Sequence, residues 1–179
     1  PVTLRDRETK QVEFATASDV ASRQLYVYDG AWIDPNQYGY WNWDQIRREP
    51  SYGTQSNTKI WVMREFENTE ANGLGIALPK GRVRFYRQDS DGRLEFVGEN
   101  MIDHTPKDET VRVYTGNSFD IVGERTQKNY NVNWDDDWLR ESFEITLRNH
   151  KDEAVEIVVV EHLYRWTNWE VQRASDPYE

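Results

Sequence analysis

The chain of 179 residues carries 22 Lys and Arg against 32 Asp and Glu, contains no Cys, and has a formal net charge of -10 at pH 7. This charge argues against a nucleic-acid partner, because phosphate binding needs a basic surface, and the missing Cys excludes disulfides, thiolate metal sites and Cys nucleophiles. No run approaches the ~18 apolar residues of a transmembrane helix, so we expect no membrane insertion. The length fits one domain over residues 1–179 with a sizeable core.

The first predicted feature is a long polar segment over residues 30–58, the aromatic loop. Loops of this length without structure of their own are uncommon and often functional. We expect an excursion from the strand framework, with little more than one helical turn at residues 44–48. Its aromatic residues are Trp32, Tyr38, Tyr40, Trp41, Trp43 and Tyr52.

The aromatic loop has two interpretations. Sugar rings stack their C–H faces on Trp and Tyr, and the interleaved Asp34, Asn42 and Asp44 could bind hydroxyl groups. The alternative, which we favour, is that these rings pack a local core, because buried aromatics dominate loop packing as well as core packing. The predicted glycan-binding residues are Trp32, Tyr38, Tyr40, Trp41, Trp43 and Asp44.

Strand patterns fill the rest of the chain. Residues 82–88 and 93–97 flank Asp91-Gly92, a strong hairpin pattern. Apolar residues alternate with polar ones over 142–148, which indicates a half-buried strand. The β-branched run at 155–160 predicts a central strand, paired with 142–148 through a turn. We therefore expect an all-β chain, an antiparallel β-sandwich of immunoglobulin-like layout with about nine to eleven strands.

Several motifs, in the same order, resemble a bacterial family known as domain of unknown function 4139, which is related to the mucoidy inhibitor A proteins. The resemblance covers about two-thirds of the chain, from residue 59 to residue 179. It implies a β-rich, extracytoplasmic module with no agreed activity, and it transfers no catalytic residue. The matching segments are Phe66-Glu67-Asn68, Asn72-Gly73-Leu74-Gly75, and residues 78–84, 102–109, 119–125, 147–153 and 161–179.

The chain also departs from that family. The coiled-coil region and companion domain of the mucoidy inhibitor relatives are absent from it. Members of the family continue with strand-like sequence beyond the position of Glu179. A missing neighbour strand would leave an open sheet edge, which is a template for pairing with another chain.

Three carboxylates between two Trp residues form a candidate calcium site. Asp135, Asp136 and Asp137 lie between Trp134 and Trp138, and calcium prefers such oxygen ligands. The alternative, which we favour, is a solvated acidic turn. Apart from this calcium hypothesis we expect no cofactor.

The three histidines give no metal or catalytic motif. His104, His150 and His162 contain no close ligand pair, and turn or capping hydrogen bonds are the favoured roles for the first two. His104 with Asp103, Asp108 and Glu109 is the least improbable catalytic cluster, but no nucleophile accompanies it. We therefore expect no enzyme activity.

These observations leave three functional hypotheses in order. The first is a non-catalytic structural or assembly module of the bacterial cell envelope or an extracellular filament, outside the cytoplasm, which binds itself or another envelope protein. The second is a carbohydrate-binding module that uses the aromatic loop. The third is a hydrolase built on carboxylates or His104.

Overall fold

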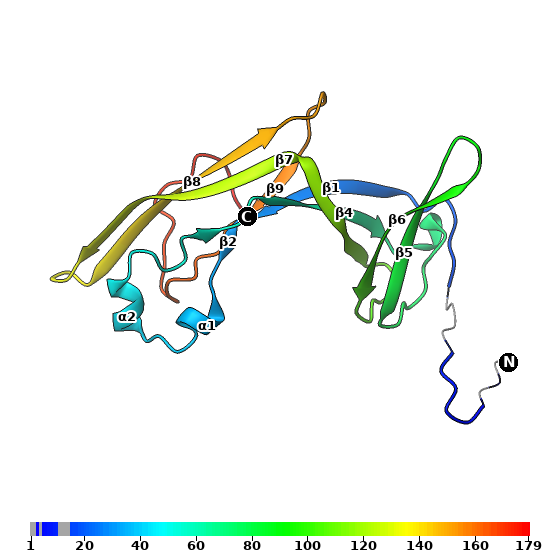
Figure 1. Ribbon diagram of the computed structural model, residues 1–179, viewed down its shortest axis with the longest axis horizontal. Coiled ribbons are helices and arrows are strands. Elements are labelled where there is room, and N and C mark those ends of the chain that lie inside the picture. The colour runs from blue at the N-terminus through cyan, green and yellow to red at the C-terminus, as the bar shows by residue number, and fades with distance from the viewer. Residues whose placement is uncertain (1–2, 4, 11–14) are drawn as a thin grey trace. The chain divides into compact units, whose positions relative to one another are not determined.

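A computed structural model describes residue 3, residues 5–10 and residues 15–179 (Figure 1). Strands predominate, so the all-β prediction is confirmed. No helix of these described residues is long and apolar enough to cross a membrane. The elements are β1 (Ser22–Asp29), β2 (Ala31–Trp32), α1 (Pro35–Tyr38), α2 (Trp43–Arg48), β3 (Gln55–Ser56), β4 (Lys59–Glu67), the 3-10 helix η1 (Glu70–Asn72), β5 (Gly81–Gln88), β6 (Leu94–Ile102), β7 (Thr110–Asn133), β8 (Trp138–Asn149) and β9 (Ile157–Val160).

The strands form one mixed sheet of five strands in the order β8-β7-β4-β1-β9, and two small sheets, β2-β3 and β5-β6. The predicted hairpin at Asp91-Gly92 is confirmed, because β5 and β6 pair in antiparallel fashion. The predicted position of β9 is wrong. It pairs parallel to β1 rather than with β8 and lies at a sheet edge, where Val158 and Val159 are 37% and 41% exposed. The immunoglobulin-like sandwich stays a prediction.

The chain divides into two compact units. Unit 1 comprises residues 1–23 and 64–113, and unit 2 comprises residues 24–63 and 114–179. β1, β4 and β7 contribute residues to both. These two units do not decide whether residues 1–179 form a single domain, which stays a prediction.

The core of unit 1 combines apolar packing with one fully buried amide. Phe66, Val111 and Val113 form its buried cluster. Asn68 is also fully buried, and its side-chain amide donates to the carbonyl oxygens of Ile76 and Pro106, both at 2.7 Å. Because an unpaired amide would be costly there, these hydrogen bonds hold two loops against β4.

A buried carboxylate also stabilises unit 1. Glu65 on β4 accepts hydrogen bonds from Arg112 (2.7 Å) and Arg23 (2.6 Å). Its side chain is 8% exposed, whereas those of the two arginines are about half exposed or more. The hydrogen bond from Arg112, with a smaller contribution from Arg23, lowers the pKa of Glu65 below its ordinary value.

Replacing Glu65 by Gln should reduce the free energy of unfolding by about 2 kcal/mol at pH 7, because charge-assisted hydrogen bonds are lost. A lowered pKa stabilises the fold above the ordinary Glu range, and this stabilisation is lost as the pH falls through the lowered value. The difference between wild type and Glu65→Gln in urea unfolding should therefore shrink towards acid pH. A difference that is constant with pH would contradict this assignment.

The core of unit 2 is built around Tyr28. Its ring is fully buried with Ile60 and Ile121, and its hydroxyl donates to the Asn57 carbonyl oxygen at 2.9 Å. The ring lies against the backbone of Gly123, where an added Cβ would come within 2.2 Å of it. Only glycine leaves room for this ring at that position.

The substitution Gly123→Ala should therefore destabilise the protein by about 1–3 kcal/mol, because it overpacks the core. Gly81→Ala is a matched control on a strand, since its added Cβ would meet nothing closer than 3.7 Å. Thermal and urea unfolding of both variants test the prediction. Equal stability of the two variants would contradict it.

Candidate functional site

The aromatic loop is folded rather than irregular. It contains α1 and α2, and the short pair β2-β3 joins its two ends. Asp34 caps α1, and Asn42 forms a capping box with Gln45 at the start of α2. These two side chains therefore cap the N-termini of the helices, which accounts for two of the side chains that suggested sugar binding.

A local aromatic core lies inside the loop, as the favoured interpretation predicted. Tyr38, Ile46 and Tyr52 are buried together. The Tyr38 ring meets Trp41 at 4.9 Å and Tyr52 at 5.2 Å between centroids, both edge to face. Tyr40 is 96% exposed.

The remaining predicted glycan-binding residues lie at the surface or outside this core. Trp32 is 52% exposed and Asp44 is exposed. Trp43 packs on Trp166, with centroids 4.5 Å apart. The six predicted residues therefore do not form one shared surface. Their role in sugar binding stays a prediction.

Arg165 anchors the loop to the C-terminal segment. It is 6% exposed, and its guanidinium donates to the carbonyl oxygens of Ile46, Glu49 and Tyr52 at 2.8–3.1 Å. Its Nε donates to the Glu141 carboxylate at 3.0 Å. The carbonyl groups at the end of a helix lack partners within the helix, and Arg165 satisfies them here.

A second buried arginine fixes the end of the same loop. Arg125 on β7 donates to both oxygens of Glu161 and to the Gly53 carbonyl oxygen. Its guanidinium lies 3.5 Å from the centre of the Phe143 ring. The ion pair with Glu161 neutralises the positive charge of Arg125, which would otherwise be costly to bury.

A third buried arginine connects α2 to the tip of the β7-β8 hairpin. Arg47 forms an ion pair with Asp137 and donates to the Asn133 carbonyl oxygen at 3.1 Å. Its guanidinium lies between Trp43 and Trp134, at 5.7 Å and 4.4 Å from the ring centres. Cation–π contact of this kind orients the Trp134 ring, and Figure 1 shows α2 beside the hairpin tip.

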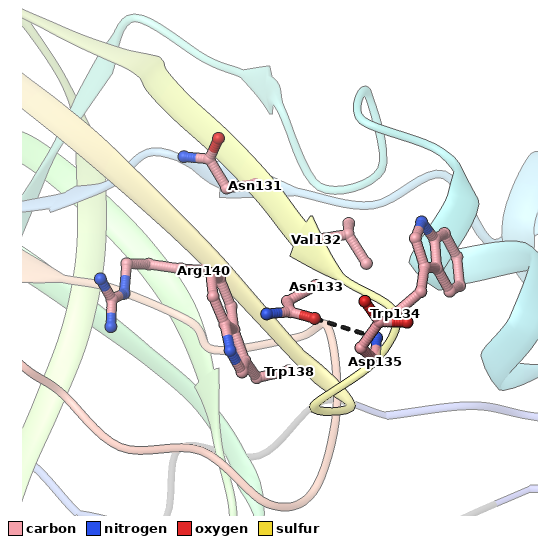
Figure 2. A pocket seen from close by; sticks show the side chains of 7 residues that line it. All are labelled: Asn131, Val132, Asn133, Trp134, Asp135, Trp138 and Arg140. Atoms are coloured by element: carbon pink, nitrogen blue, oxygen red, sulfur yellow. Dashed lines mark hydrogen bonds between the residues drawn. The ribbon is translucent and has the colours of Figure 1, made fainter.

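The hairpin tip surrounds an open hollow of about 570 Å³, the tip hollow. Figure 2 shows Trp134 and Trp138 on either side of Asn133 and Asp135. The tryptophans are 54% and 40% exposed. The lining residues are Asn131, Val132, Asn133, Trp134, Asp135, Trp138 and Arg140.

The acidic turn lies beside this hollow. Asp137 binds Arg47, and Asp136 accepts a hydrogen bond from the Asn133 amide at 2.9 Å. Among the residues that the structure describes, no group of three His, Cys, Asp or Glu could hold a metal ion. Two of the three carboxylates therefore already have partners, and calcium binding by Asp135, Asp136 and Asp137 stays a prediction.

The histidines lie apart from this hollow. His104 accepts a hydrogen bond from the Lys80 amide, and His150 donates its own amide to Asp120. His162 contacts the Asp29 carboxylate at 3.0 Å and stacks on Tyr164. The His104 bond joins two segments far apart in the chain, and the His150 bond is made by its backbone and continues the β7-β8 pairing. The turn or capping role of these two side chains stays a prediction.

The chain matches no family model, no curated protein and no solved structure. Its resemblance to domain of unknown function 4139 stays a prediction.

The sequence alone did not reveal that three arginines are buried. A hint was available for one of them, Arg165, which lies between Tyr164 and Trp166. The sequence alone also led us to separate the tip tryptophans from the glycan hypothesis, because they flank the candidate calcium site.

Replacing Arg165 by Met should reduce the free energy of unfolding by about 3–5 kcal/mol, because several buried carbonyls and Glu141 lose their donor. Arg148→Met is the control, since its ion pair with Glu124 is about half exposed and should contribute at most about 1 kcal/mol. Urea unfolding gives both values, and hydrogen exchange should show faster opening of residues 43–53 in Arg165→Met. Unchanged exchange there would contradict the anchoring role.

Proposed function

We propose that this protein is a non-catalytic structural or assembly module, and that it associates with a second copy of itself through the outer face of the β5-β6 hairpin. The family resemblance supports a location in the bacterial envelope or an extracellular filament, and an immunoglobulin-like arrangement of strands. The observation that supports self-association is an apolar surface on this hairpin, which belongs to unit 1.

That surface consists of large side chains on one face of two paired strands. Tyr86 pairs with Phe96, with ring centroids 5.8 Å apart, and Leu94 lies next to them on the same face. Met101 lies on that face too, beyond the ion pair of Arg84 with Glu99. These four side chains are 51–67% exposed. A cluster of this kind favours protein–protein contact, because scattered single residues are the usual pattern on monomers.

Charge favours a second copy as the occupant. The hairpin over residues 81–102 contains four Arg and four Asp or Glu, so its formal charge is zero, and the whole net charge of -10 lies elsewhere. Arg84 also pairs with Glu99 on the outer face at 3.0 Å. Two acidic copies repel each other least where each surface is neutral. Salt should therefore strengthen association by screening the remaining repulsion.

The substitution Phe96→Ser should weaken self-association at least tenfold, or about 1.4 kcal/mol, because it removes a central apolar side chain. Light scattering of the purified chain over a range of concentrations, at low and physiological salt, gives the dissociation constant. Phe119→Ser is the matched control, since Phe119 is 96% exposed on β7 and lies outside the hairpin.

Association that depends on Phe96 and not on Phe119 would support the proposal. A monomer at every concentration would overturn it. Equal effects of the two substitutions would also overturn it, because they would indicate general stickiness. Circular dichroism of each variant confirms that it is folded before these results are compared.

A further inference from the structure

We propose that the tip hollow of the β7-β8 hairpin binds an uncharged oligosaccharide. This inference concerns unit 2 and does not rest on the assembly function. It differs from the sugar-binding hypothesis for the aromatic loop, since none of the six residues predicted there lines the hollow.

The pairing of the two strands places the polar residues on one face. Asn131 pairs with Arg140, and Asn133 pairs with Trp138. Because side chains alternate along a strand, these four share the outer face, and their spacing along each strand is about 6–7 Å. The result is a row of amide, guanidinium and indole groups along one side of the open hollow, which suits an extended ligand of several rings.

The Trp134 side of the hollow is held in place before any ligand arrives. Trp134 is exposed, yet buried Arg47 lies 4.4 Å from its ring centre. Arg140 lies 5.2 Å from the ring centre of Trp138. Both exposed indole rings offer apolar faces to the C–H groups of a sugar, and the Trp134 ring does so with little loss of conformational entropy.

Exposed polar groups without a partner in the protein complete the site. Within the described part of the chain, the side-chain amide of Asn131 and the carboxylate of Asp135 have no hydrogen-bond partner, and the Arg140 guanidinium has neither a hydrogen bond nor an ion pair. Asn131 offers both donors and an acceptor, Arg140 offers donors and Asp135 offers acceptors. Sugar hydroxyls need this mixture, because each hydroxyl both donates and accepts.

Charge selects a neutral glycan over an acidic one. Asp135, Asp136 and Asp137 lie in the turn beside the hollow, and the chain as a whole has a net charge of -10. Asp137 is already paired with Arg47, and the guanidinium groups of Arg48 and Arg140 lie against the two tryptophan rings. The tip therefore has no excess of positive charge to hold a polyanionic glycan, which the acidic chain as a whole repels.

The test is to titrate the full chain with four hexasaccharides and to measure binding by calorimetry and by tryptophan fluorescence. The probes are β-1,4-linked glucose, β-1,4-linked N-acetylglucosamine, α-1,4-linked glucose and, as the acidic probe, oligogalacturonate. We expect saturable binding of at least one neutral probe at up to millimolar concentration, and at least tenfold weaker binding by Trp138→Ala and by Asn131→Ala.

Trp169→Ala is the matched control, because Trp169 is 61% exposed but does not line the hollow. It should bind as wild type does, and so should Phe96→Ser, which tests assembly separately. The inference would be overturned if none of the neutral probes showed saturable binding. Equal losses in Trp138→Ala and Trp169→Ala, or preferred binding of oligogalacturonate, would also overturn it. Unfolding curves establish that each variant is folded.

Discussion

The guanidinium of Arg165 is the constraint on which the aromatic loop and its contacts in unit 2 depend. A segment that turns through two short helices presents many backbone carbonyls without partners, and burying them unpaired would be costly. Arg165 donates to the carbonyls of Ile46, Glu49 and Tyr52, while Glu141 balances its charge. A planar group with five donors can satisfy several acceptors at once, which a Lys ammonium on a flexible stem does less well.

Arg47 extends this support to the molecular surface. The segment that Arg165 holds includes α2, and α2 carries Arg47 to the hairpin tip, where it meets Asp137 and Trp134. The surface tryptophan is thus ordered by a buried charge rather than by burial of its own ring. This explains how an exposed indole can be ordered, as the proposed oligosaccharide site requires, and why the tip hollow belongs to the same network as the aromatic loop.

Much of the fold was determined by local sequence. Alternating polarity and turn chemistry predicted strands and the β5-β6 hairpin at Asp91-Gly92, because side-chain period and positive φ are properties of a few adjacent residues. The aromatic density of residues 30–58 likewise predicted a local core, and Tyr38 and Tyr52 form it. Composition alone gave the acidic charge and the lack of thiol chemistry.

The tertiary structure decided what depends on partners far apart in the chain. β9 pairs parallel to β1, about 130 residues away, and no local pattern specifies that choice of neighbour. The contacts of Arg165 span more than 110 residues, so its burial could not be inferred from its neighbours. The tip hollow arises because pairing places Asn131 and Asn133 beside Arg140 and Trp138. Sequence determines which side chains are available, and long-range pairing determines which of them meet.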